Sequence, residues 1–84
     1  MKRIFLRVRN DNEKIFLKQF ANRLRSRRLE LNLSQLQLAE MVDCHLNAIS
    51  RIESGRIDPS LLMFLRLCRA LKISAKDLLP EICE

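Results

Sequence analysis

The sequence has 84 residues, enough for one small domain, and its 48% hydrophobic content is typical of a globular chain rather than a disordered one. It contains one Gly, two Pro, no Trp and no Tyr, so turn-forming residues are scarce and an all-helical fold is favoured. The formal net charge is +6, and residues 1–28 hold ten of the 16 Lys and Arg residues but two of the ten acidic residues. This basic segment suits either a polyanionic partner or an ordinary solvated surface.

Several protein classes are excluded by composition and spacing. Cys44, Cys68 and Cys83 are an odd number without motif spacing, which argues against a disulfide framework and a zinc site. The N-terminal residues are charged too often for a secretory signal, and no apolar run approaches the roughly 20 residues of a membrane span. We therefore expect a cytoplasmic protein that binds no metal, no cofactor and no membrane.

The first 13 residues differ in pattern from the rest. Ile4, Leu6 and Val8 occupy alternate positions, which is typical of a strand. A single strand in a helical protein needs a partner strand from a second chain, and otherwise this segment is a basic arm. The sequence leaves both interpretations open, so residues 1–13 are treated as an N-terminal arm or strand and residues 14–84 as the main domain.

Helical periodicity begins at about residue 13 and continues to about residue 31. Arg28 falls within the apolar stripe of this helix, where an unpaired charge is costly, so an acidic partner is predicted in the core. Asn32 is suited to the left-handed conformation that ends a helix. The predicted stripe consists of Leu17, Phe20, Ala21, Leu24, Arg28 and Leu31.

Two short helices are predicted next, joined by a very short turn at Asp43 and Cys44. Ser34 is a suitable N-cap for the first, at about residues 35–42, which directs Leu38, Ala39 and Val42 inward. The second covers about residues 45–53, with Ala48, Ile49 and Ile52 on its inner face and Leu46, Asn47, Ser50 and Arg51 on its outer face. Glu53 lies between the two faces and is the best candidate partner for Arg28.

The C-terminal third predicts two further helices. Over residues 60–71 the expected core stripe is Leu61, Phe64, Leu65, Cys68 and Leu71. Ser74, with Asp77 three residues later, resembles a capping box that opens a short helix ended by Pro80. More apolar residues remain than so short a segment can enclose, and such a surplus usually marks an interface. We therefore predict a homodimer interface made of Leu62, Met63, Leu78, Leu79 and Ile82.

The two short helices have the arrangement of a helix-turn-helix unit, whose second helix enters the major groove of DNA. Residues 20–79 resemble the Cro/phage-repressor (XRE-type) helix-turn-helix family. The resemblance rests on Arg28, Leu33-Ser34-Gln35, Leu38-Ala39, Ile49-Ser50-Arg51-Ile52-Glu53, Gly55-Arg56 and Pro59-Ser60-Leu61. It implies an all-α, five-helix, lambda-repressor-like DNA-binding domain with an ion pair between Arg28 and Glu53. Asp43, His45 and Lys72 depart from the family pattern, which usually has Gly, Ser or Thr, and Gly at these positions.

The resemblance implies a sequence-specific transcriptional regulator, not an enzyme, that binds a double-stranded, pseudo-palindromic operator as a homodimer. Residues 45–53 are then the recognition helix. Gln35 and Arg56 match positions that contact the DNA backbone, whereas Asn47, Arg51 and Leu46 suit adenine, guanine and a thymine methyl group. The full expected DNA-binding set is Gln35, His45, Leu46, Asn47, Ser50, Arg51 and Arg56. The alternative is a protein-interaction module of the same fold, such as an antitoxin or co-regulator, in which the outer face is merely solvated.

Overall fold

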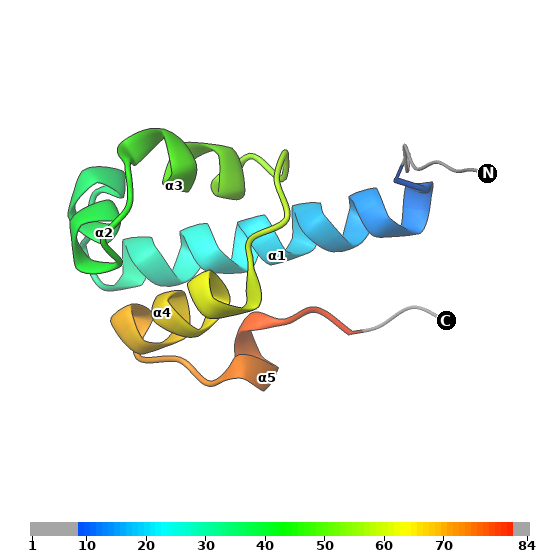
Figure 1. The fold of residues 1–84 in the computed structure, drawn as a ribbon. Coiled ribbons are helices and arrows are strands. Elements are labelled where there is room, and N and C mark those ends of the chain that lie inside the picture. The colour runs from blue at the N-terminus through cyan, green and yellow to red at the C-terminus, as the bar shows by residue number, and fades with distance from the viewer. Residues whose placement is uncertain (1–8, 82–84) are drawn as a thin grey trace.

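The structure, a computed structural model, describes residues 9–81. They form five helices in the order α1 (Asp11–Glu30), α2 (Gln35–Met41), α3 (Leu46–Glu53), α4 (Leu61–Leu71) and α5 (Ala75–Leu78), and no strand occurs in this range. The expected all-α, five-helix architecture is therefore confirmed (Figure 1). The alternating segment at residues 4–8 and the expected interface residue Ile82 lie outside the described residues. None of these five helices is both long and apolar enough to cross a membrane.

Helix α1 begins earlier than the periodicity predicted. The Asn10 side chain accepts a hydrogen bond from the Glu13 backbone N–H (2.9 Å), and the Glu13 carboxylate accepts one from the Asn10 N–H (3.0 Å). This reciprocal capping box satisfies two backbone donors that a helix N-terminus leaves without partners. Residues 11–13 consequently belong to α1 instead of the N-terminal arm to which their sequence assigned them.

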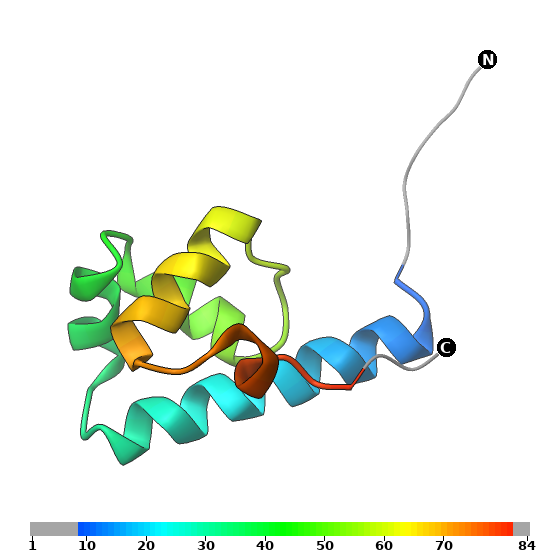
Figure 2. The same cartoon turned by 90° about the horizontal axis from the view of Figure 1, so that it is seen from below.

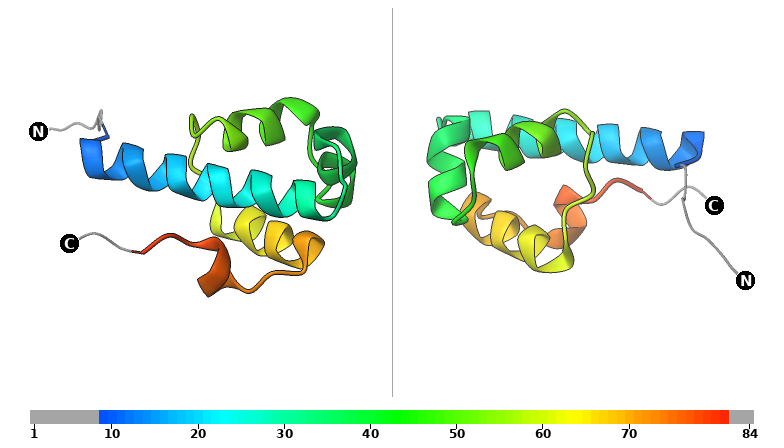
Figure 3. Two further views of the ribbon diagram at one scale, coloured as in Figure 1. Left: turned by 180° about the vertical axis from the view of Figure 1, so that it is seen from behind. Right: turned by 45° about the horizontal axis from the view of Figure 1, so that its top comes forward.

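The long helix α1 lies behind the shorter helices in the view of Figure 1, where α2 and α3 appear above it and α4 and α5 below it. Figure 2 shows α2, α3 and α4 on the same side of α1, and the view from behind in Figure 3 has α1 in front. The N-terminal half of α1 extends beyond the other helices (Figure 2). The core that the five helices enclose contains Phe20, Leu24, Leu38, Ala39, Val42, Ile49, Ile52, Leu67, Cys68, Leu71 and Leu78.

Among residues 9–81, three non-glycine residues adopt the left-handed backbone conformation between helices. Asn32, as expected, takes a φ of 58° after α1, while Asp43 and Lys72 have φ values of 57° and 53°. An L-residue pays up to roughly 1–2 kcal/mol for this conformation, and Asp and Asn pay least. Each turn returns backbone hydrogen bonds to the helix before it, including Cys44 N–H to Ala39 O at 3.0 Å and Ile73 N–H to Cys68 O at 3.1 Å. The interhelix turns stay short even where the family usually has Gly.

The buried face of α4 differs from the predicted one. Leu61 is 83% exposed and Leu65 is 42% exposed, whereas Leu67 is fully buried, so Leu61 and Leu65 were wrongly assigned to the core. Phe64, Cys68 and Leu71 do face the core, and the Phe64 ring lies against Phe20 of α1 with 6.0 Å between ring centroids. Because nearly every position from 61 to 68 is apolar, periodicity alone allowed two overlapping stripes.

Part of the predicted dimer interface is also wrong. Leu78 is fully buried in the core of its own chain, and Met63 is half-buried against that core. Leu62 and Leu79 are exposed, as an interface requires.

The predicted capping box at the start of α5 is only partly formed. Ser74 is the N-cap, but its hydroxyl donates to the Asp77 carboxylate (2.8 Å) and makes no capping hydrogen bond to the backbone.

Two arginines of α1 bind backbone carbonyl groups of the C-terminal helices. Arg27 donates to the carbonyl oxygens of Leu71 (2.8 Å) and Lys72 (3.1 Å), at the C-terminal end of α4. Arg23 donates to the carbonyl oxygens of Asp77 (3.3 Å) and Leu79 (2.8 Å) around the end of α5. The last carbonyl groups of a helix have no intrahelical donors, so these guanidinium groups satisfy them and join α1 to α4 and α5.

Candidate nucleic-acid interface

Helices α2 and α3 form a compact helix-turn-helix unit. Ser34 caps α2 as predicted: its hydroxyl accepts from the Gln37 N–H (3.0 Å), and the Gln37 side chain accepts from the Ser34 N–H (2.7 Å). Ile49 and Ile52 of α3 are buried with the inner face of α2 in the common core. The unit therefore presents the opposite face of α3 outward, above α1 in the view of Figure 1.

The outer face of α3 consists of the four predicted residues. Leu46, Asn47, Ser50 and Arg51 are all exposed, and their spacing places them on one side of the helix. Within residues 9–81, no hydrogen bond or ion pair engages the side chains of Asn47, Ser50 or Arg51. This face thus offers an amide, a hydroxyl, a guanidinium and an apolar side chain to a partner.

The position of α3 is set by a buried polar network. The Arg28 Nε and Nη2 atoms donate to the Glu53 carboxylate at 2.6 and 3.0 Å, and the Arg28 Nη1 atom donates to the Leu33 carbonyl oxygen at 2.7 Å. The predicted ion pair between α1 and the end of α3 is therefore present. Its two side chains are only 8% and 3% exposed. Burial strengthens the attraction between the two charges and makes the loss of either partner costly.

Gln35 joins this network, a role that sequence reasoning missed. Its side-chain Nε2 atom donates to Glu53 Oε1 at 3.0 Å, and the residue is half-buried. The amide at the start of α2, expected to contact a DNA phosphate, is thus also part of the internal structure. A second N–H of the same amide remains for another acceptor. The sequence did indicate that Glu53 would need a further donor. As the predicted core partner of Arg28, its carboxylate can accept more hydrogen bonds than Arg28 alone donates.

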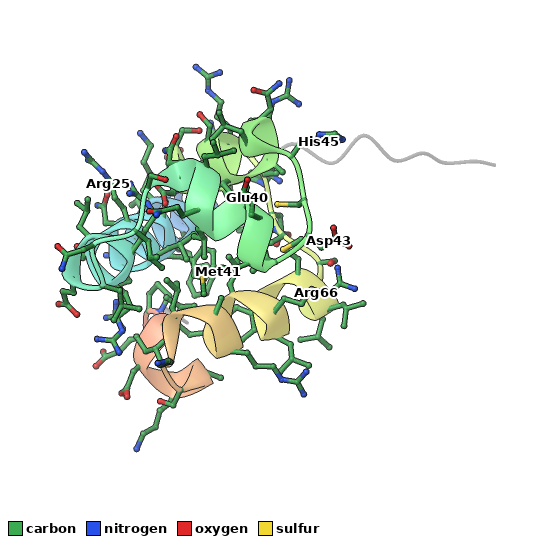
Figure 4. The ribbon with its side chains drawn as sticks, turned by 90° about the vertical axis from the view of Figure 1, so that its left-hand side faces the viewer. Arg25, Glu40, Met41, Asp43, His45 and Arg66 are labelled. Atoms are coloured by element: carbon green, nitrogen blue, oxygen red, sulfur yellow. The ribbon has the colours of Figure 1, made fainter. Side chains whose placement is uncertain are left out.

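His45 and Cys44 lie at the turn before α3. His45 is the N-cap of α3, but its exposed side chain makes no capping hydrogen bond, and Figure 4 shows it projecting from the same edge of the unit as Asp43. Burial raises the pKa of the Cys44 thiol, the Asp43 carboxylate raises it further, and Arg66 opposes the effect. Burial likewise raises the pKa of Cys68. Both thiols are therefore protonated at neutral pH, a state that makes them poor nucleophiles and poor metal ligands.

Arg56 follows α3 in the segment that leads to α4. Its side chain is exposed, and its backbone N–H donates to the Arg51 carbonyl oxygen at 3.1 Å, which places it directly after the last turn of α3. Gln35, whose amide reaches Glu53 at the last residue of α3, and Arg56, just beyond that residue, thus both lie near the C-terminal end of α3. Side chains at the end of a reading helix can contact the DNA backbone beside it.

Comparisons with known proteins agree on this architecture. The restriction-modification controller protein C.AhdI from Aeromonas hydrophila has 34% sequence identity to this chain, with a TM-score of 0.71 over 74% of this chain and 94% of its own. The clp gene regulator ClgR from Corynebacterium glutamicum has 27% identity and a TM-score of 0.72 over 75% of this chain and 67% of its own. A hypothetical transcription factor, NHTF, from Neisseria shares the fold at 23% identity, with a TM-score of 0.75 over 93% of this chain and 90% of its own.

No curated protein sequence matches the chain. Residues 24–78, which contain α2, α3, α4, α5 and the last seven residues of the 20-residue α1, match the model of the helix-turn-helix family HTH_3. The match includes the buried Arg28–Glu53 pair and the whole outer face of α3. The chain therefore belongs to the HTH_3 helix-turn-helix family.

Proposed function

We propose that this protein is a transcriptional regulator that binds double-stranded DNA sequence-specifically, with α3 in the major groove. The observation that carries the proposal is the outer face of α3, where Asn47, Ser50 and Arg51 are exposed and without internal partners on a helix fixed by a buried ion pair. A rigid helix with unsatisfied polar side chains is what base-edge recognition requires. The controller C.AhdI and the regulator ClgR, to which the chain is similar, support the same class of function.

The exposed side chains divide by chemistry into two roles. Asn47 suits a bidentate contact to adenine and Arg51 to guanine, while Leu46 suits a thymine methyl group and Ser50 either kind of base edge. Arg56 and the free N–H of the Gln35 amide suit phosphate oxygens, which position the protein without reading sequence. His45, beside the N-terminus of α3, suits a phosphate or a base edge.

A homodimer completes the proposal, with its interface on the exposed side of α4. Leu61, Leu62 and Leu65 lie on one side of α4 and are exposed, and Leu79 after α5 is exposed as well. Leu62 and Leu79 belong to the originally expected set, whereas Met63 packs inward. One reading helix contacts few base pairs, and a two-fold dimer reads two half-sites about one DNA turn apart. A pseudo-palindromic operator follows from that symmetry.

Selection of bound sequences from a random DNA pool, followed by titration of the selected duplex, tests this function. The expected result is an enriched motif with two related half-sites roughly 10 base pairs apart, bound more tightly than random DNA. A full-length protein that binds no duplex even at low salt would refute the proposal. If it then captured a protein partner at high salt, the interaction-module alternative would replace it.

A further inference from the structure

A groove runs between the N-terminal half of α1 and the segment that follows α3. Four basic side chains line it, Arg9, Lys14, Lys18 and Arg56, and none of its described lining residues is acidic. We call this feature the basic groove. Lys14 and Lys18 are one helical turn apart and share one side of α1, with the buried Leu17 between them.

Gly55 explains how residues so distant in sequence come together. Its φ is 77°, and a Cβ atom added there would lie 3.5 Å from the Lys18 Cα atom and 3.4 Å from its Cδ atom. The chain leaving α3 therefore passes close enough to α1 for such a Cβ atom to make ordinary van der Waals contact with Lys18. The positive φ is the feature that favours glycine at this position. This contact carries Arg56 to the side of α1 on which Lys14 and Lys18 lie.

The cations of α1 differ between its two halves. In the C-terminal half, Arg23, Arg27 and Arg28 donate to carbonyl or carboxylate oxygens of the same chain, and Arg25 alone among the four is exposed without such a bond within residues 9–81. Lys14 and Lys18 are exposed and make no hydrogen bond or ion pair within residues 9–81. Like charges one turn apart disfavour a helix. Such a group of unpaired cations attracts a polyanion that binds from outside.

The basic groove also lies in the right place for the DNA backbone. It opens beside the C-terminal end of α3, where the N-terminal half of α1 extends past that helix (Figure 1). When a helix occupies the major groove, about 12 Å wide, the phosphate strands pass on either side of it. Residues 9–18 precede the part of the chain that matches the family model, residues 24–78, so the family match does not include these lysines.

We propose that Lys14 and Lys18, together with Arg9 and Arg56, bind the phosphate backbone of the strand that passes the C-terminal end of α3. This inference rests on the proposed DNA binding and adds a second contact surface to it. The contact reads no bases, because ammonium groups on phosphates respond to charge and not to sequence. It anchors the recognition unit beside the C-terminal end of α3.

The salt dependence of DNA affinity tests the proposal in the full chain. With Lys14 and Lys18 both replaced by Gln, the slope of log affinity against log salt should become shallower by about 2, since each lost phosphate contact removes about 0.9. Affinities for the selected operator and for random duplex should fall together, leaving their ratio unchanged. The matched control, Arg69→Gln with Lys76→Gln, removes the same charge from exposed positions on α4 and α5 and should leave the slope near its original value.

The possible outcomes distinguish the basic-groove contact from the proposed DNA binding on which it rests. Wild-type binding with an unchanged slope in the Lys14→Gln, Lys18→Gln variant would overturn the basic-groove contact and leave the proposed function intact. Equal slope changes in both double variants would also overturn it, because the effect would then belong to net charge. Restoration of the slope by Lys14→Arg with Lys18→Arg would support it. Absence of duplex binding by the wild-type protein would overturn the proposed function itself.

Discussion

The Arg28 guanidinium and the Glu53 carboxylate, 25 positions apart in sequence, meet in a two-point hydrogen-bonded ion pair at 2.6 and 3.0 Å. The pair joins the C-terminal half of α1 to the last residue of α3. Because Gln35 donates to the same carboxylate, the start of α2 is tied to the end of α3 as well. The orientation of the outer face of α3 therefore depends on a few buried polar atoms and not only on apolar packing.

Glu53→Ala should destabilise the fold by about 3–5 kcal/mol, because it leaves the Arg28 charge buried and unpaired. Urea unfolding followed by circular dichroism measures this difference. Glu30→Ala is the matched control, since Glu30 forms an exposed ion pair with Arg27 and should lose no more than about 1 kcal/mol. Equal unfolding midpoints for Glu53→Ala and wild type would contradict the structural role of the pair.

Gln35→Ala should lower both stability and DNA affinity. The loss of its hydrogen bond to the Glu53 carboxylate should cost about 1–3 kcal/mol of unfolding free energy, as expected for a bond to a charged group. Affinity for all duplexes should weaken together, measured well below the unfolding temperature. Gln19→Ala, at an exposed position of α1, serves as the control. An undiminished unfolding free energy for Gln35→Ala would show that the network does not need its amide.

Asn47→Ala and Arg51→Ala should change which sequences are bound, each at one base position and by about 1–3 kcal/mol. Arg56→Ala should instead weaken all sequences by a similar factor, because its proposed contact is a phosphate. Binding to a panel of operator variants, each with one base pair changed, distinguishes these profiles. The assignment of roles fails if Arg51→Ala and Arg56→Ala give the same profile across the panel.

Arg27→Ala should reduce stability without altering the salt dependence of DNA binding. Its side chain donates to the Leu71 and Lys72 carbonyl oxygens, and their loss should cost about 1–3 kcal/mol. Arg25→Ala removes the same charge at an exposed position and should leave the unfolding midpoint nearly unchanged. Calorimetry and salt titration of the two variants measure both quantities. A shallower salt slope specific to Arg27→Ala would show that this guanidinium also binds DNA.

Leu62→Glu combined with Leu65→Glu should give a folded monomer with weaker operator binding, because both side chains lie exposed on one side of α4. Sedimentation at micromolar concentration should show a dimer for the wild-type protein. Leu29→Glu, at an exposed position near the end of α1, should remain dimeric. Met63 is unsuitable for this test because it packs against the core. A wild-type protein that stays monomeric at high concentration would reject the preformed dimer.

Much of this protein was determined by the sequence itself, where residues act within a few positions of one another. Helical periodicity and the caps at Ser34 and Asn32 predicted five helices, and the inner residues of α3 predicted which of its faces is exposed. The cost of burying the Arg28 charge predicted a carboxylate partner, and Glu53 is that partner. The helices and the exposed face of α3 were predicted correctly because each had one locally consistent solution. The ion pair joins residues 25 positions apart and was predicted from the cost of an unpaired buried charge.

Only the tertiary structure decided which side of α4 is buried, because its apolar residues allow more than one stripe. Packing against residues distant in sequence, such as Phe64 against Phe20, leaves Leu67 buried and Leu61 and Leu65 exposed. The tertiary structure also decided which basic residues of α1 bind within the chain and which do not. Arg23 and Arg27 became internal donors because the ends of α4 and α5 bring carbonyl oxygens to them. Lys14 and Lys18 make no hydrogen bond or ion pair within residues 9–81, because the chain that leaves α3 beside them brings Gly55 and Arg56 there and no carboxylate. Charge can be counted in a sequence, but its availability to a partner depends on which acceptors the fold brings within reach.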